Sequence, residues 1–130
     1  MIAVDTNVLV RLVVDDPDAP KQMDLAKALL QKAKQVFIPQ IVQVELVWVL
    51  ESAYGFDKAS VITLLKQLQH SPCYVLQQPA QFTSALTHFE NNPADFSDYL
   101  ILATCVEHNQ ALHTFDKKFA RLALVNLLKE

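Results

Sequence analysis

Short apolar runs alternate along the chain with longer stretches in which apolar residues recur at helical spacing. The runs predict buried strands at residues 2–4, 35–38, 73–76, 111–114 and 125–128. The periodic stretches predict helices near residues 7–14, 20–34, 41–54, 58–69, 80–90, 95–108 and 117–122. Because strands that alternate with helices favour a parallel sheet covered on both faces, we expect an α/β fold. The expected architecture is a three-layer α/β/α sandwich with a central parallel sheet of four to five strands.

A few residues indicate where these helices begin, end and face. Asp18 and Asp57 are predicted to cap the second and fourth helices, because their side chains can accept from first-turn amides. Gly55, the only glycine, is predicted to end the third helix. Four residues of the second helix and four of the fourth share one face each: Leu25, Ala28, Leu29 and Lys32, then Val61, Leu64, Leu65 and Leu68.

Composition narrows the class of protein. With 130 residues, of which 52% are hydrophobic and 19% charged, we expect one ordered domain over residues 1–130. No apolar run approaches the ~20 residues of a membrane span, and no basic leader precedes the first one, so we expect a cytoplasmic protein. A single glycine excludes the glycine-rich loops of P-loop and Rossmann nucleotide binders. The net charge of −3 weighs against a general nucleic-acid binder, unless bound divalent ions cancel several acids.

Four carboxylates occupy positions where apolar residues are expected. Asp5 and Asp116 each follow a predicted strand, where ligands of α/β proteins bind if those strands are neighbours. Asp98 begins an apolar stripe that continues through Ile101, Leu102 and Cys105. Glu45 shares a helix face with Ile41, Val44, Trp48, Val49 and Ser52. A carboxylate within such a stripe is costly unless it is paired or binds a metal.

A purely structural role competes with a functional one for three of these acids. Asp5 and Asp116 could cap helices, and Asp98 could stabilise a helix N-terminus. Glu45 lies in mid-helix, and Arg11 is the only arginine before Arg121. Four acids without matching buried cations indicate a divalent metal, and oxygen ligands suit Mg²⁺ or Mn²⁺ better than Zn²⁺. Such a site favours phosphoryl transfer by a metal-activated water.

Four segments resemble, in order, the signatures of the PIN-domain family: Val4-Asp5-Thr6-Asn7-Val8-Leu9, Glu45, Asp95-Phe96-Ser97-Asp98 with Ile101-Leu102-Ala103, and Thr114-Phe115-Asp116-Lys117-Lys118-Phe119. The resemblance implies a metal-dependent endoribonuclease whose catalytic acids are Asp5, Glu45, Asp98 and Asp116. Asp5, Asp98 and Asp116 would hold the metal, while Glu45 completes the cluster or orients the water. Thr6, Asn7 and Thr114 would support the site, and Asp95 is either a fifth acid or a helix cap.

Length and single-domain form resemble the VapC toxins of type II toxin–antitoxin systems. That resemblance implies a VapB-type antitoxin, a homodimer within a larger complex, and structured RNA such as transfer RNA as substrate. Lys117, Lys118 and Arg121 would contact phosphates, although a solvated helix face explains them equally well. One alternative is an RNA-processing PIN nuclease outside a toxin pair. A receiver-like phosphorylation switch is disfavoured, because the third predicted strand and the residues after it, 73–78, contain no acid.

Overall fold

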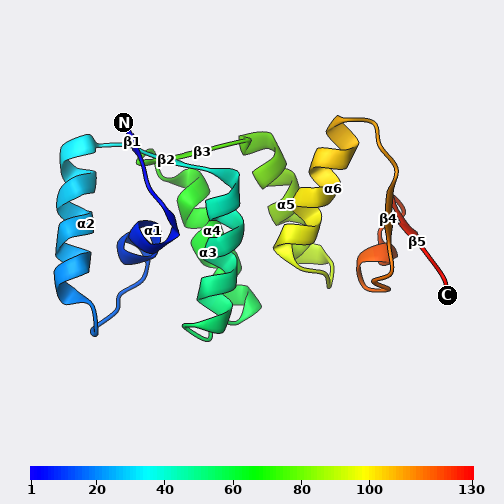
Figure 1. The fold of residues 1–130 in the computed structure, drawn as a ribbon, viewed down its shortest axis with the longest axis horizontal. Helices are drawn as coiled ribbons and strands as arrows, with labels where there is room; N and C mark the ends of the chain where they lie inside the picture. The colour runs from blue at the N-terminus through cyan, green and yellow to red at the C-terminus, as the bar shows by residue number, and fades with distance from the viewer. The chain divides into compact units, whose positions relative to one another are not determined.

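The computed structural model describes all residues, Met1–Glu130. They divide into two compact units, Met1–Gln77 and Gln78–Glu130, called here the N-terminal and C-terminal units. Each unit has its own sheet and helices (Figure 1) and is described by itself. The single domain expected over residues 1–130 stays a prediction.

The N-terminal unit contains a three-stranded parallel sheet with four helices. Its elements are β1 (Ile2–Ala3), α1 (Thr6–Val13), α2 (Pro20–Ala33), β2 (Val36–Ile38), α3 (Gln40–Ser52), α4 (Lys58–His70) and β3 (Tyr74–Leu76). The strand order is β1-β2-β3, with Ile2 opposite Val36 and Val36 opposite Tyr74. Parallel neighbours require crossover connections, and the helices between the strands supply them.

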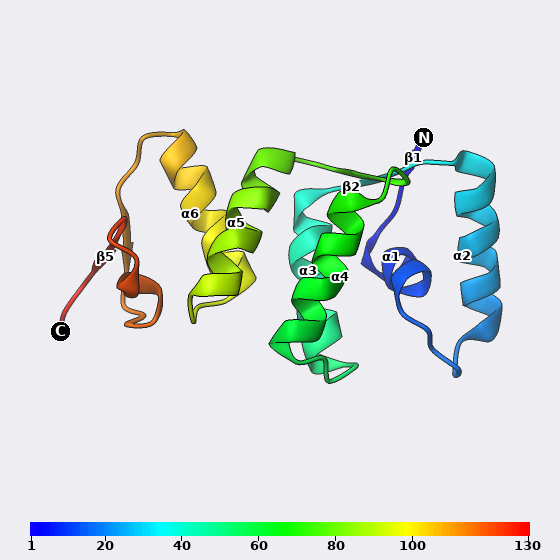
Figure 2. The same cartoon turned by 180° about the vertical axis from the view of Figure 1, so that it is seen from behind.

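The C-terminal unit pairs two helices and two parallel strands. Its elements are α5 (Pro79–Asn91), α6 (Phe96–Glu107), β4 (Leu112–Thr114), the 3₁₀ turn η1 (Phe119–Arg121) and β5 (Val125–Leu127). Helices α5 and α6 lie side by side in both views (Figures 1 and 2). Thr114 of β4 is opposite Leu127 of β5. The predicted α/β class with parallel strands is confirmed, and no helix is both long and apolar enough to cross a membrane.

Of the three predicted helix boundaries, the cap at Asp57 is confirmed. Asp57 caps α4 by accepting from the backbone N of Ser60 at 2.8 Å. Helix α3 ends at Ser52 with Ala53 as its C-cap residue, two residues before the predicted Gly55, which lies in the following loop with a left-handed φ of 65°. The predicted cap by Asp18 is wrong, since Ala19 is the N-cap residue of α2 and its side chain makes no capping bond. Asp18 belongs instead to the preceding turn, in which its N–H donates to Asp16 Oδ1 at 2.9 Å.

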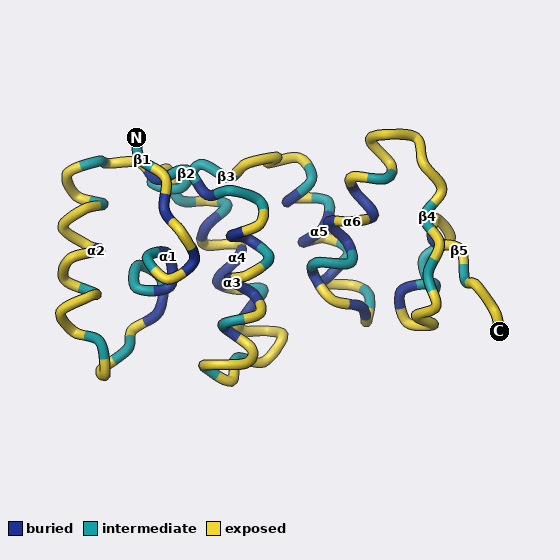
Figure 3. Tube along the Cα trace, in the orientation of Figure 1, coloured by how far each residue is buried: buried dark blue, intermediate teal, exposed yellow.

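The predicted apolar face is buried in α4 but exposed in α2. Val61, Leu64, Leu65 and Leu68 are buried in α4, as their spacing indicates. In α2, by contrast, Leu25 is 72% exposed and Leu29 41% exposed, so this face does not pack (Figure 3). The only buried residue of α2 is Ala26. Helix α2 packs on α1, and the small side chain of Ala26 permits close approach of the two helices.

The face of α3 that carries Glu45 is also not the buried one. The buried residues of α3 are Val42, Gln43, Leu46, Val47 and Leu50. Ile41 is 66% exposed, Trp48 is 68% exposed, and Glu45 itself is exposed. The helix is apolar on nearly every side, so its spacing alone could not indicate which side packs on α1 and α4. The expectation that Glu45 lies in a buried apolar stripe is therefore wrong. Its assignment as a candidate catalytic acid depends instead on its contacts.

Candidate active site

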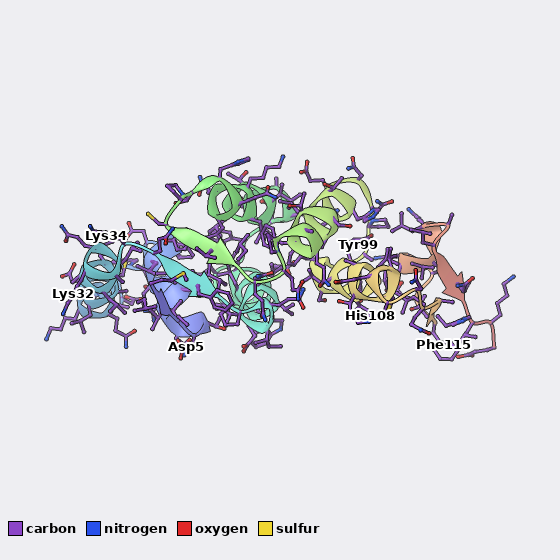
Figure 4. All side chains as sticks on the ribbon, turned by 90° about the horizontal axis from the view of Figure 1, so that it is seen from above. Asp5, Lys32, Lys34, Tyr99, His108 and Phe115 are labelled. Carbon is purple, nitrogen blue, oxygen red and sulfur yellow. The ribbon has the colours of Figure 1, made fainter.

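Asp5 stands where β1 ends and α1 begins. Its backbone is extended, with φ −84° and ψ −179°, and its side-chain Oδ1 accepts from the backbone N of Val8 at 3.1 Å. This bond satisfies one of the free amides at the helix N-terminus. The capping role is thus real, but it occupies only one carboxylate oxygen. Asp5 is exposed (Figure 4), and its Oδ2 is left for another partner.

Thr6 connects the first acid to the second. It is only 9% exposed, and its Oγ1 donates to Glu45 Oε1 across 3.3 Å. The two residues are 39 positions apart in the sequence, so the fold of the N-terminal unit brings Glu45 to the start of α1. Asn7 is exposed in the same first turn. Glu45 therefore contacts the residue that follows Asp5, and its Oε2 is unused by this bond.

A pocket of about 320 Å³ adjoins Asp5 within the N-terminal unit. Its lining combines residues of the α1 start with residues of α2: Asp5, Asn7, Val8, Arg11, Gln22, Leu25, Ala26 and Leu29. Arg11 and Gln22 were not among the predicted site residues. They contact each other through Arg11 Nε, which donates to Gln22 Oε1 at 2.8 Å. The spacing of Asp5, Val8 and Arg11 at intervals of three places them on one side of α1 and could have indicated this wall.

Arg11 also binds an acid of its own, Asp16. Its Nη1 lies 3.3 Å from Asp16 Oδ2 and donates to the hydroxyl of Tyr54 at 2.9 Å, while that hydroxyl donates to the same Oδ2 at 2.8 Å. The bond from Tyr54, then the amide of Asp18 and the charge of Arg11, hold the pKa of Asp16 below its usual value. Arg11, Asp16 and Tyr54 are thus hydrogen-bonded to one another and are called here the Arg11 cluster. The ion-pair partner of Arg11 is therefore Asp16 and not Glu45.

In the C-terminal unit, Asp98 occupies the first turn of α6. Its Oδ2 accepts from the backbone N of Asp95, the N-cap residue, at 3.2 Å. Asp98 is partly buried, and this burial is the main cause that raises its pKa. The negative charges of Asp95 and Asp116 raise the pKa further, against the opposing effect of the hydrogen bond from Asp95. Asp98 thus lies within electrostatic range of two other candidate acids and has no basic partner.

Asp116 shapes the turn that follows β4. Its backbone N donates to Thr114 Oγ1 at 3.0 Å, and its Oδ1 accepts from the backbone N of Lys118 at 2.8 Å. A longer bond of 3.4 Å reaches Oδ1 from the amide of Phe119. An aspartate that binds amides two and three residues ahead is a common turn former. Here too one oxygen, Oδ1, maintains local structure and leaves Oδ2 available.

An aromatic contact holds this turn against α6. The rings of Phe119 and Tyr99 meet edge to face with centroids 5.7 Å apart, and both residues are buried. Tyr99 is fixed in turn because its hydroxyl accepts from the backbone N of Ala94 at 2.9 Å. Since Tyr99 directly follows Asp98, this contact keeps Asp116 in range of Asp98. Three predicted phosphate contacts, Lys117, Lys118 and Arg121, are exposed along the same turn.

The donor atoms fit a hard divalent cation. Asp5, Glu45, Asp98 and Asp116 each use one carboxylate oxygen in a hydrogen bond within their own unit and keep the other free of hydrogen bonds. Such oxygens are the ligands that Mg²⁺ and Mn²⁺ prefer. Burial is the main cause that raises the pKa of Asp98, and the charges of Asp95 and Asp116 add to it. Within either unit, no three His, Cys, Asp or Glu side chains are close enough to hold a metal by themselves.

Two comparisons with known proteins bear on this donor set. No curated protein matches the chain. The model of the PIN domain matches residues 2–125, which include all four candidate acids. PIN domains are generally nucleases and typically use divalent metals. Because the match extends over nearly the whole chain, the chain belongs to the PIN-domain family.

Proposed function

We propose that this chain is a Mg²⁺-dependent endoribonuclease and the toxin of a type II toxin–antitoxin pair. Asp5, Asp98 and Asp116 hold the cation, with Mn²⁺ able to replace Mg²⁺, and Glu45 is the fourth catalytic acid. Membership of a nuclease family supports the general reaction. The resemblance to VapC toxins in length and motif order supports the finer assignment.

The observation that carries the proposal is the hydrogen bond from Thr6 to Glu45. It joins the residue after the first acid to the second acid across 39 positions. A structural cap at Asp5 requires no such neighbour, because the bond to Val8 already satisfies the helix. A hydroxyl that holds one oxygen of Glu45 also orients the other, as outer partners of metal-site carboxylates commonly do.

The chain's own residues have separable tasks in this reaction. A divalent cation, when bound, lowers the pKa of water and offsets charge on the phosphate. Glu45 Oε2 accepts a hydrogen bond from the attacking water and orients it, while Thr6 fixes the carboxylate through Oε1. Lys117, Lys118 and Arg121 pair with phosphates on either side of the cleaved bond. Water adds to phosphorus in line as the ribose 3′ oxygen leaves, so the products carry a 5′ phosphate and a 3′ hydroxyl.

The partners follow from the toxin assignment. A VapB-type antitoxin inhibits the enzyme, the toxin forms a homodimer within the complex, and the substrate is transfer RNA or another structured RNA in the cytoplasm. Production of the chain alone is expected to arrest bacterial growth, and co-production of a short protein encoded immediately upstream should relieve the arrest. A chain that cleaves RNA in vitro without affecting growth would instead support an RNA-processing nuclease outside a toxin pair.

Asp5 and Asp57 provide a matched pair for the decisive experiment. Both are exposed N-caps that accept from the amide three residues ahead, at 3.1 Å and 2.8 Å. Asparagine caps helices about as well as aspartate, so Asp5→Asn and Asp57→Asn both keep the cap but lose the charge. We expect Asp5→Asn to lower RNA cleavage at least ~100-fold, the scale of losses at metal sites, and Asp57→Asn to leave it within about twofold.

The assay uses purified full-length protein and a fluorescent RNA in Mg²⁺, Mn²⁺ or EDTA, with thermal melting as a check on folding. Wild-type cleavage that persists in EDTA would contradict the metal-dependent mechanism. Equal loss in the Asp5 and Asp57 variants would show that the helix caps, rather than a catalytic acid, set the rate.

A further inference from the structure

Phe115 is an exposed aromatic residue directly beside a candidate catalytic acid. Its side chain is 68% exposed, and it connects Thr114, the last residue of β4, to Asp116 (Figure 4). Single exposed apolar residues are common on protein surfaces and need no explanation. Phe115, however, also lines a pocket in the C-terminal unit. Its position and its surroundings together suggest a ligand.

The pocket has a volume of about 550 Å³, within the usual range of small-molecule sites. Six residues line it: Phe115, Lys117, Leu127, Leu128, Lys129 and Glu130. Its walls come from the ends of two parallel strands, since Thr114 is opposite Leu127 and the Leu128 backbone N donates to Thr114 O at 2.7 Å. Leu128 is itself 46% exposed, so the pocket combines an aromatic ring with an open aliphatic wall.

The charged residues that line this pocket are two lysines, Lys117 and Lys129, and one acid, Glu130. Residues 115–130 contain four basic residues (Lys117, Lys118, Arg121 and Lys129) and two acids (Asp116 and Glu130), a formal net charge of 4 − 2 = +2. The full chain carries −3. Proteins bind single-stranded nucleic acid with aromatic rings and basic residues in one groove, because bases stack on the ring and phosphates pair with the lysines. A neutral apolar peptide could not form ion pairs with these basic residues.

We propose that Phe115 is a stacking platform for an unpaired RNA base next to the cleaved phosphodiester, with Lys117 and Lys129 contacting the adjoining phosphates. The inference rests on the proposed function and specifies its substrate. A base within a duplex already stacks on both neighbours and cannot cover the ring. The enzyme therefore selects nucleotides in loops or other single-stranded segments of a structured RNA. Phe115 binds the substrate and takes no part in the bond cleavage.

The first measurement is equilibrium binding of a fluorescent single-stranded RNA in EDTA, where metal-dependent cleavage does not interfere. Phe115→Ala is expected to weaken binding about tenfold, within the range seen for loss of one stacked base. Phe115→Trp should retain wild-type affinity, and Phe115→Leu should behave like alanine, because leucine is apolar but has no ring. A duplex of equal length should bind more weakly than the single strand and be insensitive to Phe115→Ala.

Leu124→Ala is the matched control. Leu124 is 60% exposed in the same unit but does not line this pocket, so its loss should leave RNA affinity unchanged. Wild-type affinity in Phe115→Ala would overturn the proposal. Full rescue by leucine would also overturn it, because an apolar side chain without a ring would then suffice for RNA binding. Equal binding of duplex and single strand would contradict selection of unpaired bases.

These outcomes are separable from those of the nuclease assay. A protein that binds RNA through Phe115 but does not cleave it contradicts the proposed function and leaves stacking intact. A protein that cleaves RNA and binds it equally well without the ring contradicts stacking alone.

Discussion

The Arg11 cluster and the acids around Asp98 place the same kind of side chain in opposite electrostatic surroundings. Asp16 receives a hydroxyl, an amide and a guanidinium, and its pKa is lowered. Asp98 receives one amide and faces Asp95 and Asp116, and its pKa is raised, chiefly by burial. An acid whose partners are all supplied by the chain is sufficiently explained by structure. Asp98 has no such set of partners, and the proposed function assigns it to a bound cation.

Asp98, rather than Glu45, is the acid that the chain leaves without a full set of partners. The sequence pattern favoured Glu45 as the acid without a structural explanation, because its helix face is apolar. Glu45 is exposed and bonded to Thr6, so burial costs it little. Asp98 has the property that was expected of Glu45, since it is partly buried among like charges. The predictions below test whether the two kinds of acid differ in function, beginning with the largest expected effect.

Removing the charge of Asp98 should separate activity from stability. Asp98→Asn is expected to reduce metal-dependent RNA cleavage at least ~100-fold, because it removes a proposed metal ligand. In EDTA the same variant should be at least as stable as wild type near neutral pH, since it relieves repulsion with Asp95 and Asp116. Cleavage assays and urea unfolding of the same preparation measure both effects. Normal cleavage by a folded Asp98→Asn protein would remove this acid from the site.

Divalent ions should stabilise the wild-type protein. At a concentration 100 times the dissociation constant, a ligand that binds only the folded state adds about 2.7 kcal/mol to the free energy of unfolding. For a chain of this size that corresponds to a rise in Tm of roughly 10 °C. Melting curves in Mn²⁺ and in EDTA should show the shift in wild type and in Asp57→Asn, but not in Asp5→Asn. An equal shift in all three proteins would indicate non-specific binding.

Breaking the Arg11 cluster should lower stability and leave RNA cleavage nearly unchanged. Tyr54→Phe removes the hydroxyl that bonds both Arg11 and Asp16. We expect a loss of about 1 kcal/mol in the free energy of unfolding, a fall in Tm of about 3–5 °C, and cleavage within about twofold of wild type. Thermal melting and the RNA assay check these values. A large loss of cleavage at unchanged stability would assign the cluster to the active site.

The two acids should also respond oppositely to pH, as the smallest of these effects. Because the pKa of Asp16 is lowered on folding, its contribution is present above its ordinary value of 3.8 and is lost as pH falls through the folded value. Because the pKa of Asp98 is raised, its contribution is present below 3.8 and is lost as pH rises through the folded value.

Urea unfolding in EDTA between pH 3 and pH 7, a range of about one unit below and three above the ordinary aspartate pKa, can detect this opposition. As pH rises, wild type should gain stability relative to Asp16→Asn and lose it relative to Asp98→Asn. Parallel pH profiles for the two variants would show that the two environments do not differ.

Much of the fold was predictable because it depends on residues close together in the sequence. The strands and helices occur near their predicted positions, with ends shifted by one or two residues, since turns and caps such as Asp57 and Gly55 act locally. Asp5 follows β1 and Asp116 follows β4, as their positions after apolar runs indicate. The ordered acidic segments also sufficed to identify the family that the PIN model matches.

Helix faces and partners were not predictable in the same way. Both α2 and α3 offer more than one apolar side, and only packing on α1, and for α3 also on α4, selects Ala26 and Leu46 for burial rather than Leu25 and Trp48. Similarly, no local pattern indicates that Tyr54 bonds Asp16 from 38 residues away. The free energy of such contacts depends on residues that the fold alone brings together.

The sequence by itself thus determined the elements, the family and the set of candidate acids, because local propensity and motif order are properties of neighbouring residues. Only the tertiary structure decided which acid is satisfied and which is not. Asp16 and Asp98 are indistinguishable as residues, and their pKa values shift in opposite directions because different segments surround them. The bond between Thr6 and Glu45 and the exposure of Phe115 beside Asp116 are likewise products of the folded chain.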